Sequence, residues 1–153
     1  MADNPVFAIR HGWKLRQSKV FADAIQELER ETLRLSVKDP LKYELHPKAK
    51  LFIRVTNLIL DEIPLDPNST TYALGNTLGA AHRHWRRAKF LQRFRLFYRF
   101  ESASHTIIYG WMNDENTLRK SGSRNDPYAV FLQRLARREP PDSWEDLMQD
   151  SES

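Results

Sequence analysis

The sequence predicts an α+β fold, because helical and strand-like segments occupy separate parts of the chain. Two stretches in the first 65 residues place apolar side chains at spacings of three and four, as amphipathic helices do. Three consecutive runs between residues 85 and 112 are rich in aromatic and β-branched residues. Two further helical stretches follow. We therefore expect a sheet formed late in the chain, with helices before and after it.

The amino-terminal part is predicted to form a short strand and a helical hairpin. Residues 12–15 are aromatic and alternating, as in a strand. A helix over residues 18–37 ends at Asp39-Pro40 and has apolar positions at Phe21, Ala24, Ile25, Leu28 and Leu33. A second helix begins after Pro47, ends before Pro64 and carries Leu51, Phe52, Val55, Leu58, Ile59 and Ile63.

The central part is predicted to be a loop followed by three strands. Residues 64–84 combine two prolines and two glycines without sustained periodicity, which predicts a long surface loop. Loops of this length are uncommon unless they are functional. The strands are expected at 85–91, 94–101 and 106–112. In the middle strand Arg95, Phe97 and Arg99 share one face, so one face is expected to be core and the other half cationic.

Two helices are predicted in the carboxy-terminal part. Asp126 precedes Pro127 as a capping residue would, and an apolar stripe follows at Tyr128, Phe131, Leu132 and Leu135. Pro140-Pro141 is expected to end this helix. Asp142 and Glu145 fit a reciprocal capping pattern, which predicts a last short helix carrying Trp144 and Leu147.

Composition excludes several classes of protein. The 153 residues, 41% of them hydrophobic, suit a single domain over residues 1–153. With no cysteine, the chain has no disulfide, thiolate metal site or cysteine nucleophile. No apolar run approaches the roughly 20 residues that span a bilayer. The amino terminus lacks a secretion signal, so we expect a cytoplasmic protein without membrane contact.

Charge is distributed unevenly, although the net charge is only +4. Residues 82–99, here called the basic segment, hold seven of the 24 Lys and Arg side chains and no acid. From residue 139 onward, six acids stand without any Lys or Arg. This polarity predicts a polyanionic partner for the basic segment, with the acidic tail as solvated surface or as an intramolecular screen.

The basic segment suits RNA, because its cations can contact phosphates and its aromatic rings can stack on bases. An alternative is that the aromatic rings are core residues, which strand periodicity favours, and that the arginines only solvate the outer face. A merely solvated face would mix both signs of charge, so the arginines favour a phosphate ligand. Cleavage of RNA needs no metal, since the substrate's 2′-hydroxyl can attack its own phosphate while cations stabilise the developing charge.

Polar residues elsewhere leave alternatives open. His82 and His84 form an HxH pair without further clustered ligands in the sequence, which favours a phosphate-facing or structural role over a metal site. The run 113–116 follows the last strand, where Asp114 and Glu115 could act as a base, orient the arginines or simply form a turn. Arg119 and Lys120 add cations at the same edge.

Several strings resemble a known family. WRRAKFLQRFRLFYR, IIYGWMNDENTLR and NDPYAVFLQRLARREPPDSWEDL, together with HGWKL and KDPLKY near the start, are similar to YhaV-type toxins of bacterial type II toxin–antitoxin systems, within the RelE/ParE superfamily. The resemblance implies a RelE-like α+β fold, with a small antiparallel sheet and an amino-terminal helical hairpin. It also implies an endoribonuclease that cleaves mRNA, in several relatives on ribosomes, and an antitoxin partner of the PrlF type with an AbrB-like fold.

The resemblance places phosphate-holding cations at Arg87, Lys89 and Arg95. RelE itself has a catalytic tyrosine shortly after the last strand, where this sequence offers Asn113, Asp114, Glu115 and Arg119. The nearest tyrosines, Tyr109 and Tyr128, fall inside a predicted strand and on the following helix.

These arguments together assign a site. The predicted catalytic residues are Arg87, Lys89, Arg95, Asp114, Glu115 and Arg119. The predicted RNA-binding residues are His82, Arg83, His84, Trp85, Arg86, Arg93, Arg99 and Asn113, and no metal ligand or cofactor is predicted. Two other functions remain open at this point: a non-catalytic toxin like the ParE branch, which binds a protein target, and a plain nucleic-acid-binding module.

Overall fold

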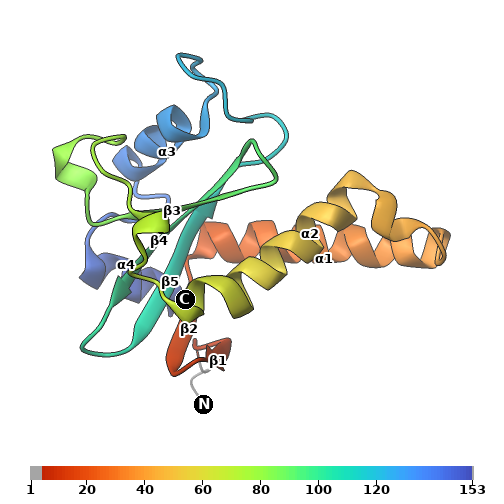
Figure 1. Ribbon diagram of the computed structural model, residues 1–153, viewed down its shortest axis with the longest axis horizontal. Helices are drawn as coiled ribbons and strands as arrows, with labels where there is room; N and C mark the ends of the chain where they lie inside the picture. The colour runs from red at the N-terminus through yellow and green to blue at the C-terminus, as the bar shows by residue number, and fades with distance from the viewer. Residues whose placement is uncertain (1–4, 153) are drawn as a thin grey trace.

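The computed structural model describes residues 5–152, which form a five-stranded mixed sheet with helices on both faces (Figure 1). The sheet order is β1-β2-β5-β4-β3. The strands are β1 (Ala8–Arg10), β2 (Trp13–Gln17), β3 (Arg86–Phe90), β4 (Phe94–Glu101) and β5 (Thr106–Met112). The predicted α+β class is confirmed. Of the predicted single domain, residues 1–4 and 153 lie outside the described residues, and its extent stays a prediction.

The sheet is mixed, so the expectation of a small antiparallel sheet is wrong in one pairing. Strand β2 runs parallel to β5, whereas the β1–β2, β3–β4 and β4–β5 pairs are antiparallel. The helical hairpin and the loop after it connect β2 to β3, which lies at the far edge of the sheet. Because β3 points in the same direction as β2, this connection is a long crossover. Strand β1 was not predicted.

The predicted helices are present. They are α1 (Lys19–Lys38), α2 (Pro47–Asn57), α3 (Pro127–Ala136) and α4 (Trp144–Ser151). Helix α1 begins where Ser18 Oγ accepts a hydrogen bond from the Phe21 backbone N–H at 3.1 Å. Helix α2 continues into a π-helical turn over Leu58–Glu62. Helices α1 and α2 form the predicted hairpin, which extends to one side of the sheet, while α3 and α4 lie on the other side (Figure 1).

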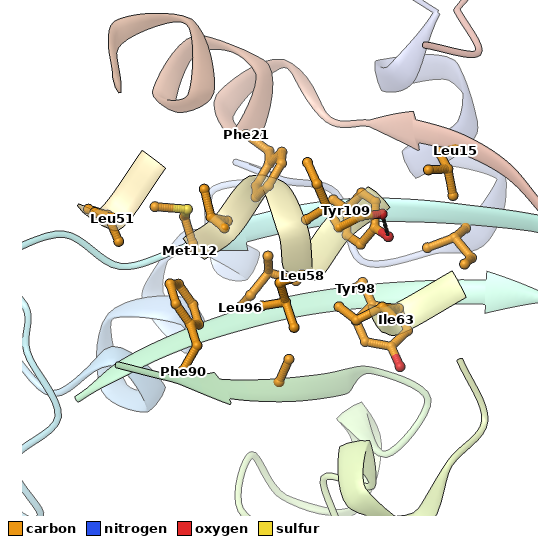
Figure 2. Close-up of a cluster of buried hydrophobic side chains, with 14 of the residues drawn as sticks. Leu15, Phe21, Leu51, Leu58, Ile63, Phe90, Leu96, Tyr98, Tyr109 and Met112 are labelled. Atoms are coloured by element: carbon orange, nitrogen blue, oxygen red, sulfur yellow. Dashed lines mark hydrogen bonds between the residues drawn. The ribbon is translucent and has the colours of Figure 1, made fainter. Parts of the chain in front are cut away.

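Side chains of the sheet contribute to two hydrophobic cores, one on each face. The core beneath the hairpin includes Phe21, Leu51, Leu58, Tyr98 and Tyr109 (Figure 2). The core beneath α3 and α4 is built around Trp85, Phe97, Trp111, Phe131 and Leu147. The predicted alternation along β4 is therefore confirmed, with Leu96 and Tyr98 in the first core and Phe97 in the second.

The long segment 64–84 is not only a surface loop. It contains two short 3₁₀ turns, Thr70–Tyr72 and Ala80–His82. Leu74 and Leu78 are buried in the core beneath α3 and α4, where they cover the edge of the sheet. The sequence did not predict the burial of Leu74 and Leu78, because an irregular segment that covers a core shows no periodic pattern of apolar residues.

The predicted capping pattern at Asp142 is wrong. Ser143 caps α4, since its Oγ accepts a hydrogen bond from the Asp146 backbone N–H at 3.2 Å. The carboxylate of Asp142 accepts instead from the indole of Trp85. The acidic tail is thus tied to the sheet; the Asp150 carboxylate also accepts a hydrogen bond from the Lys19 backbone N–H at 2.9 Å.

Within residues 5–152, no helix has both the length and the apolar character needed to cross a bilayer.

One residue of the predicted apolar stripe on α1 lies outside the core. Leu28 is 8% exposed, whereas Leu33, on the same helix, is 61% exposed. Thr32, four positions after Leu28, is buried on the same face, but Leu33 is five positions after Leu28 and lies about 140° away round the helix, so it points away from the core.

We expect Leu28→Ala to lower the free energy of unfolding by about 2–4 kcal/mol, because it empties buried volume. Leu33→Ala is the matched control, with the same change in helix propensity and an expected cost below about 0.5 kcal/mol. Urea denaturation of the three proteins measures both values. Equal losses in the two variants would contradict this account of the hairpin.

Candidate active site

Two arginines from neighbouring strands reach one hydroxyl group. Arg87 Nη1 (β3) and Arg95 Nε (β4) each donate a hydrogen bond of 3.2 Å to the hydroxyl oxygen of Tyr128. Arg95 lies opposite Lys89 in the β3–β4 pair, and alternate residues share a face, so Arg87, Lys89 and Arg95 lie on one face of the sheet. Tyr128 approaches this face from the first turn of α3.

Arg119 completes the arrangement. Its guanidinium carbon lies 4.9 Å from the centre of the Tyr128 ring, and the group forms an ion pair with Asp126. We call Arg87, Arg95, Arg119 and Tyr128 the arginine–tyrosine cluster. Arg119 and Tyr128 also line an open cavity, where the Arg119 side chain is 32% exposed and Tyr128 is 7% exposed, so Arg119 is the more accessible of the two.

One buried carboxylate holds this arrangement together. Asp126 is 4% exposed. Its Oδ2 accepts a hydrogen bond of 3.1 Å from the Tyr128 backbone N–H and caps α3, where Pro127 occupies the first turn. Its Oδ1 accepts from the Lys120 backbone N–H at 2.8 Å and from the Arg119 guanidinium. Asp126 therefore fixes the start of the helix and the arginine beside it at once.

Asn113 holds the other side of the cluster. Its Oδ1 accepts a hydrogen bond of 2.7 Å from the Arg95 backbone N–H, and its Nδ2 donates to the carbonyls of Arg93 and Thr117 at 3.2 and 2.8 Å. At 1% exposure its amide is fully engaged with the backbone. The residue predicted to bind RNA thus has its side chain turned inward, where it positions β4 against the loop that follows β5.

The structure does not bring the predicted acids to the cluster. Asp114 Oδ1 accepts hydrogen bonds from the Asn116 backbone N–H at 2.9 Å and from Thr117 Oγ1 at 3.0 Å, as a turn residue does. Glu115 pairs with Lys48 of α2 at 3.3 Å. Both acids line a cavity against α1 that shares no residue with the cavity at Tyr128.

The exposed cations of the basic segment divide between two places. Lys89 and Arg93 are exposed near the cluster, and Arg93 Nε donates to the Arg119 carbonyl at 3.1 Å. Arg83 is exposed within the 64–84 segment and donates to Asn76 at 2.7 Å, and the partly buried Arg86 donates to Asn68 of the same segment at 3.2 Å.

The remaining predicted RNA-binding residues gather at the acidic tail. Trp85 is fully buried, which leaves no ring face for a base. His82 Nδ1 and His84 Nε2 lie 3.3 and 3.0 Å from Asp142 Oδ1. Arg99 donates to the Asp142 carbonyl at 2.7 Å. Burial lowers the pKa of Arg99, although the nearby charges of Asp142, Glu145 and Glu101 oppose this shift.

The pKa of Asp142 reflects the same crowding. Burial acts to raise it, but hydrogen bonds from Trp85 and His84 and the charges of the two histidines together bring the pKa below its ordinary value. The carboxylate is therefore held in its charged form.

Tyr109, the other tyrosine near the predicted site, has a structural role. Its hydroxyl donates a hydrogen bond of 2.6 Å to the Ile59 carbonyl in the core beneath the hairpin. Burial raises the pKa of Tyr109 well above its ordinary value, so the hydroxyl keeps its proton. Sequence reasoning left Tyr128 and Asp126 out of the site; their sequence signal was the Asp-Pro-Tyr start of α3, which indicates a helix cap but no contact with distant arginines.

A small α+β fold with strand-borne cations around one tyrosine hydroxyl, open to solvent at one side, suits a protein that acts on phosphodiesters. Comparison with known proteins identifies the family. Residues 15–152 match the Toxin_YhaV family, described as a toxin with endonuclease activity, of toxin-antitoxin system. The chain therefore belongs to the YhaV toxin family, and the resemblance seen in the sequence is confirmed.

The names of two similar proteins agree with this assignment. A "Toxin YhaV" of Escherichia coli O6:H1 is 39% identical over 144 residues, which are 93% of this chain and 94% of the relative. A "Ribonuclease toxin YhaV" of Escherichia coli K12 is 38% identical over 144 residues with the same coverage of each chain. No solved structure matches the chain.

We expect Asn113→Ala to lower the free energy of unfolding by about 2 kcal/mol or more, because it leaves buried backbone groups without hydrogen-bond partners. Asn116→Ala, at an exposed position of the same loop, is the control with an expected change below about 0.5 kcal/mol. Urea denaturation tests the pair. A neutral Asn113→Ala would show that the loop does not depend on this side chain.

Proposed function

We propose that this chain is an mRNA-cleaving endoribonuclease that uses no metal ion in its reaction. The family supplies endonuclease activity, and a relative is named a ribonuclease. The observation that carries the proposal is the Tyr128 hydroxyl held between Arg87 and Arg95. In the reaction the 2′-hydroxyl loses its proton and attacks the adjacent phosphorus, and the 5′-oxygen leaves with a proton, so the products are a 2′,3′-cyclic phosphate and a 5′-hydroxyl.

Tyr128 is the proposed general acid, which donates its proton to the leaving 5′-oxygen, while the proton of the 2′-hydroxyl passes to water. A tyrosine oxygen can accept hydrogen bonds and donate one, and here both bonds to arginine are accepted. Its own O–H has no acceptor among residues 5–152, so we propose that it donates to the substrate. Guanidinium groups keep their protons and cannot take this role. We therefore prefer Tyr128 to Asp114 or Glu115, whose described contacts are with a turn and with Lys48.

The cations share the work of stabilising the phosphorane. Lys89 is exposed and Arg119 is one-third exposed, so both can contact a phosphate directly. Arg87 is half-buried and Arg95 is 7% exposed. We propose that these two add positive potential behind the site and fix the hydroxyl, while Arg93 and the more distant Arg83 and Arg86 hold flanking nucleotides.

The expected inhibitor is a PrlF-type antitoxin. An apolar groove beside the exposed cations Lys89 and Arg93 is lined by residues that include Leu51, Leu91 and Phe94. Apolar side chains of a partner could fill this groove while neighbouring acids pair with the cations. We propose that such a segment covers the path of the RNA. A cytoplasmic location, where this partner and mRNA meet, stays a prediction.

Tyr128→Phe is expected to slow RNA cleavage by about 10²–10⁴-fold, because it removes the hydroxyl and keeps the buried ring. Tyr43→Phe, on the hairpin loop, is the matched control and should cleave at the parent rate. Asp114→Asn and Glu115→Gln should stay within a few-fold of the parent. Single-turnover cleavage of a defined RNA measures all four, and a large loss in either acid variant alone would return the proton-transfer role to that acid.

Cleavage is expected to persist in excess EDTA and to yield 2′,3′-cyclic or 3′-phosphate ends. A substrate with a 2′-deoxynucleotide at the cut site should resist, because the attacking hydroxyl is missing. Arg95→Ala and Lys89→Ala are the loss-of-activity controls. If free RNA survives, translating ribosomes are added; survival there too would favour a ParE-like target or a binding module, whose RNA affinity would fall with salt without turnover.

The antitoxin complex is expected to bind RNA at least 10-fold more weakly than the free chain. Fluorescence anisotropy with a non-cleavable, 2′-deoxy-substituted RNA gives both affinities. Equal affinities would mean that the antitoxin does not act by covering the RNA path.

A further inference from the structure

We propose that His82, His84 and Asp142 bind one borderline divalent transition-metal ion, for which Zn²⁺ is the test ion, and that this ion fastens the acidic tail to the sheet. The sequence shows only an HxH pair, but the fold brings a carboxylate to it from 58 residues further along the chain. One ligand atom from each of the three side chains lies within 4.8 Å of the other two.

The spacing of the ligand atoms suits a tetrahedral ion. Bonds of about 2.0–2.1 Å from zinc to imidazole nitrogen and carboxylate oxygen imply ligand–ligand distances of roughly 3.3–3.5 Å in a tetrahedron. The distances from Asp142 Oδ1 to His82 Nδ1 and His84 Nε2 are 3.3 and 3.0 Å. Shifts of a few tenths of an ångström would therefore admit the ion among these atoms.

The chemistry of the donors points to a transition metal. Two imidazoles and a carboxylate are typical ligands for zinc and its neighbours, whereas Mg²⁺ and Ca²⁺ prefer all-oxygen sites. The Asp142 side chain faces histidines although it lies near a segment with seven cations. Arg99 approaches Asp142 closely, yet it donates to the main-chain carbonyl and leaves the carboxylate to the histidines.

A second layer of contacts already orients the carboxylate. The Trp85 indole N–H, fixed by complete burial, donates to Asp142 Oδ1 at 2.7 Å. Partners of this kind hold metal ligands in place. The ligand atom is this same Oδ1, because a carboxylate oxygen has a second lone pair that can bind the ion while the indole N–H occupies the first. The three side chains are 23–37% exposed, which gives an ion a route in and leaves room for a water as fourth ligand.

The site is separate from the arginine–tyrosine cluster. His82 and His84 precede β3, and Lys89 and Arg95 pair near the other end of that strand. An ion here would join the end of the 64–84 segment to the residues before α4, two parts of the chain that meet at Trp85. Its role is thus structural and is compatible with cleavage that uses no metal.

The test is Zn²⁺ binding to the chain after removal of metals with EDTA and dialysis. Isothermal titration calorimetry is expected to give one Zn²⁺ per chain. The melting temperature should rise by about 5–10 °C when free Zn²⁺ reaches 100 times its Kd. Co²⁺ at the same site should give the visible absorption of a four-coordinate ion.

Four variants locate the site. His82→Asn, His84→Asn and Asp142→Asn should each weaken Zn²⁺ binding at least 10-fold and reduce the thermal shift. Asp142→Asn retains an oxygen acceptor for the Trp85 indole, so it keeps the local packing. His105→Asn is the matched control; His105 lies in an exposed turn with φ of 50°, which asparagine tolerates, and Zn²⁺ binding should be unchanged.

Absence of stoichiometric binding by the parent chain would overturn the proposal and leave the cluster as a hydrogen-bonded contact. Binding retained in all three ligand variants, or lost in His105→Asn alone, would overturn it too. These results do not depend on RNA cleavage, so they separate the metal site from the proposed nuclease mechanism.

Discussion

The central strands β4 and β5 are buried on both faces, and this constraint shapes the rest of the structure. A charged side chain on such a strand needs polar partners from the elements that cover it. Arg95 finds them in the Tyr128 hydroxyl and in the carbonyls of Gln92 and Phe94. The burial that stabilises the sheet thus also selects which groups can surround the arginines, and it explains why α3 must start where it does.

The proposed active site and the stability of the fold depend on the same buried polar groups. Asn113 and Asp126 are almost inaccessible, and each connects the loop after β5 to a structural element, β4 in one case and α3 in the other. Asn113 bonds to backbone groups, and Asp126 bonds to backbone groups and to the Arg119 side chain, so both side chains connect the loop to its neighbours from almost inaccessible positions. Arg95 and Tyr128, which the loop joins, are therefore positioned before any substrate arrives.

The acidic tail makes contacts with other parts of the same chain. The uneven charge along the sequence left open whether the tail is a solvated surface or an intramolecular screen for the basic segment. Its contacts with Lys19, Trp85 and the two histidines show that it packs against the rest of the fold. Its contact with Arg99 also removes one cation from the surface. Lys89 and Arg93 stay exposed at the end of the sheet beside Tyr128.

The sequence by itself determined the elements and the chemical character of the site. Period-two and helical patterns located β4, β5, α1 and α3 closely, because each pattern reflects burial of one local face. The acid-free basic segment predicted a phosphate ligand, and the family resemblance pointed to Arg87, Lys89 and Arg95 within it. Only the tertiary structure decided what they contact. Tyr128 looked like one apolar position of a helix, Asp142 like a cap, and Asp114 like a candidate base. The partners of Tyr128 and Asp142 lie 33 to 60 residues away, whereas those of Asp114 lie within a turn. Such pairings depend on how the elements pack, which local periodicity does not encode.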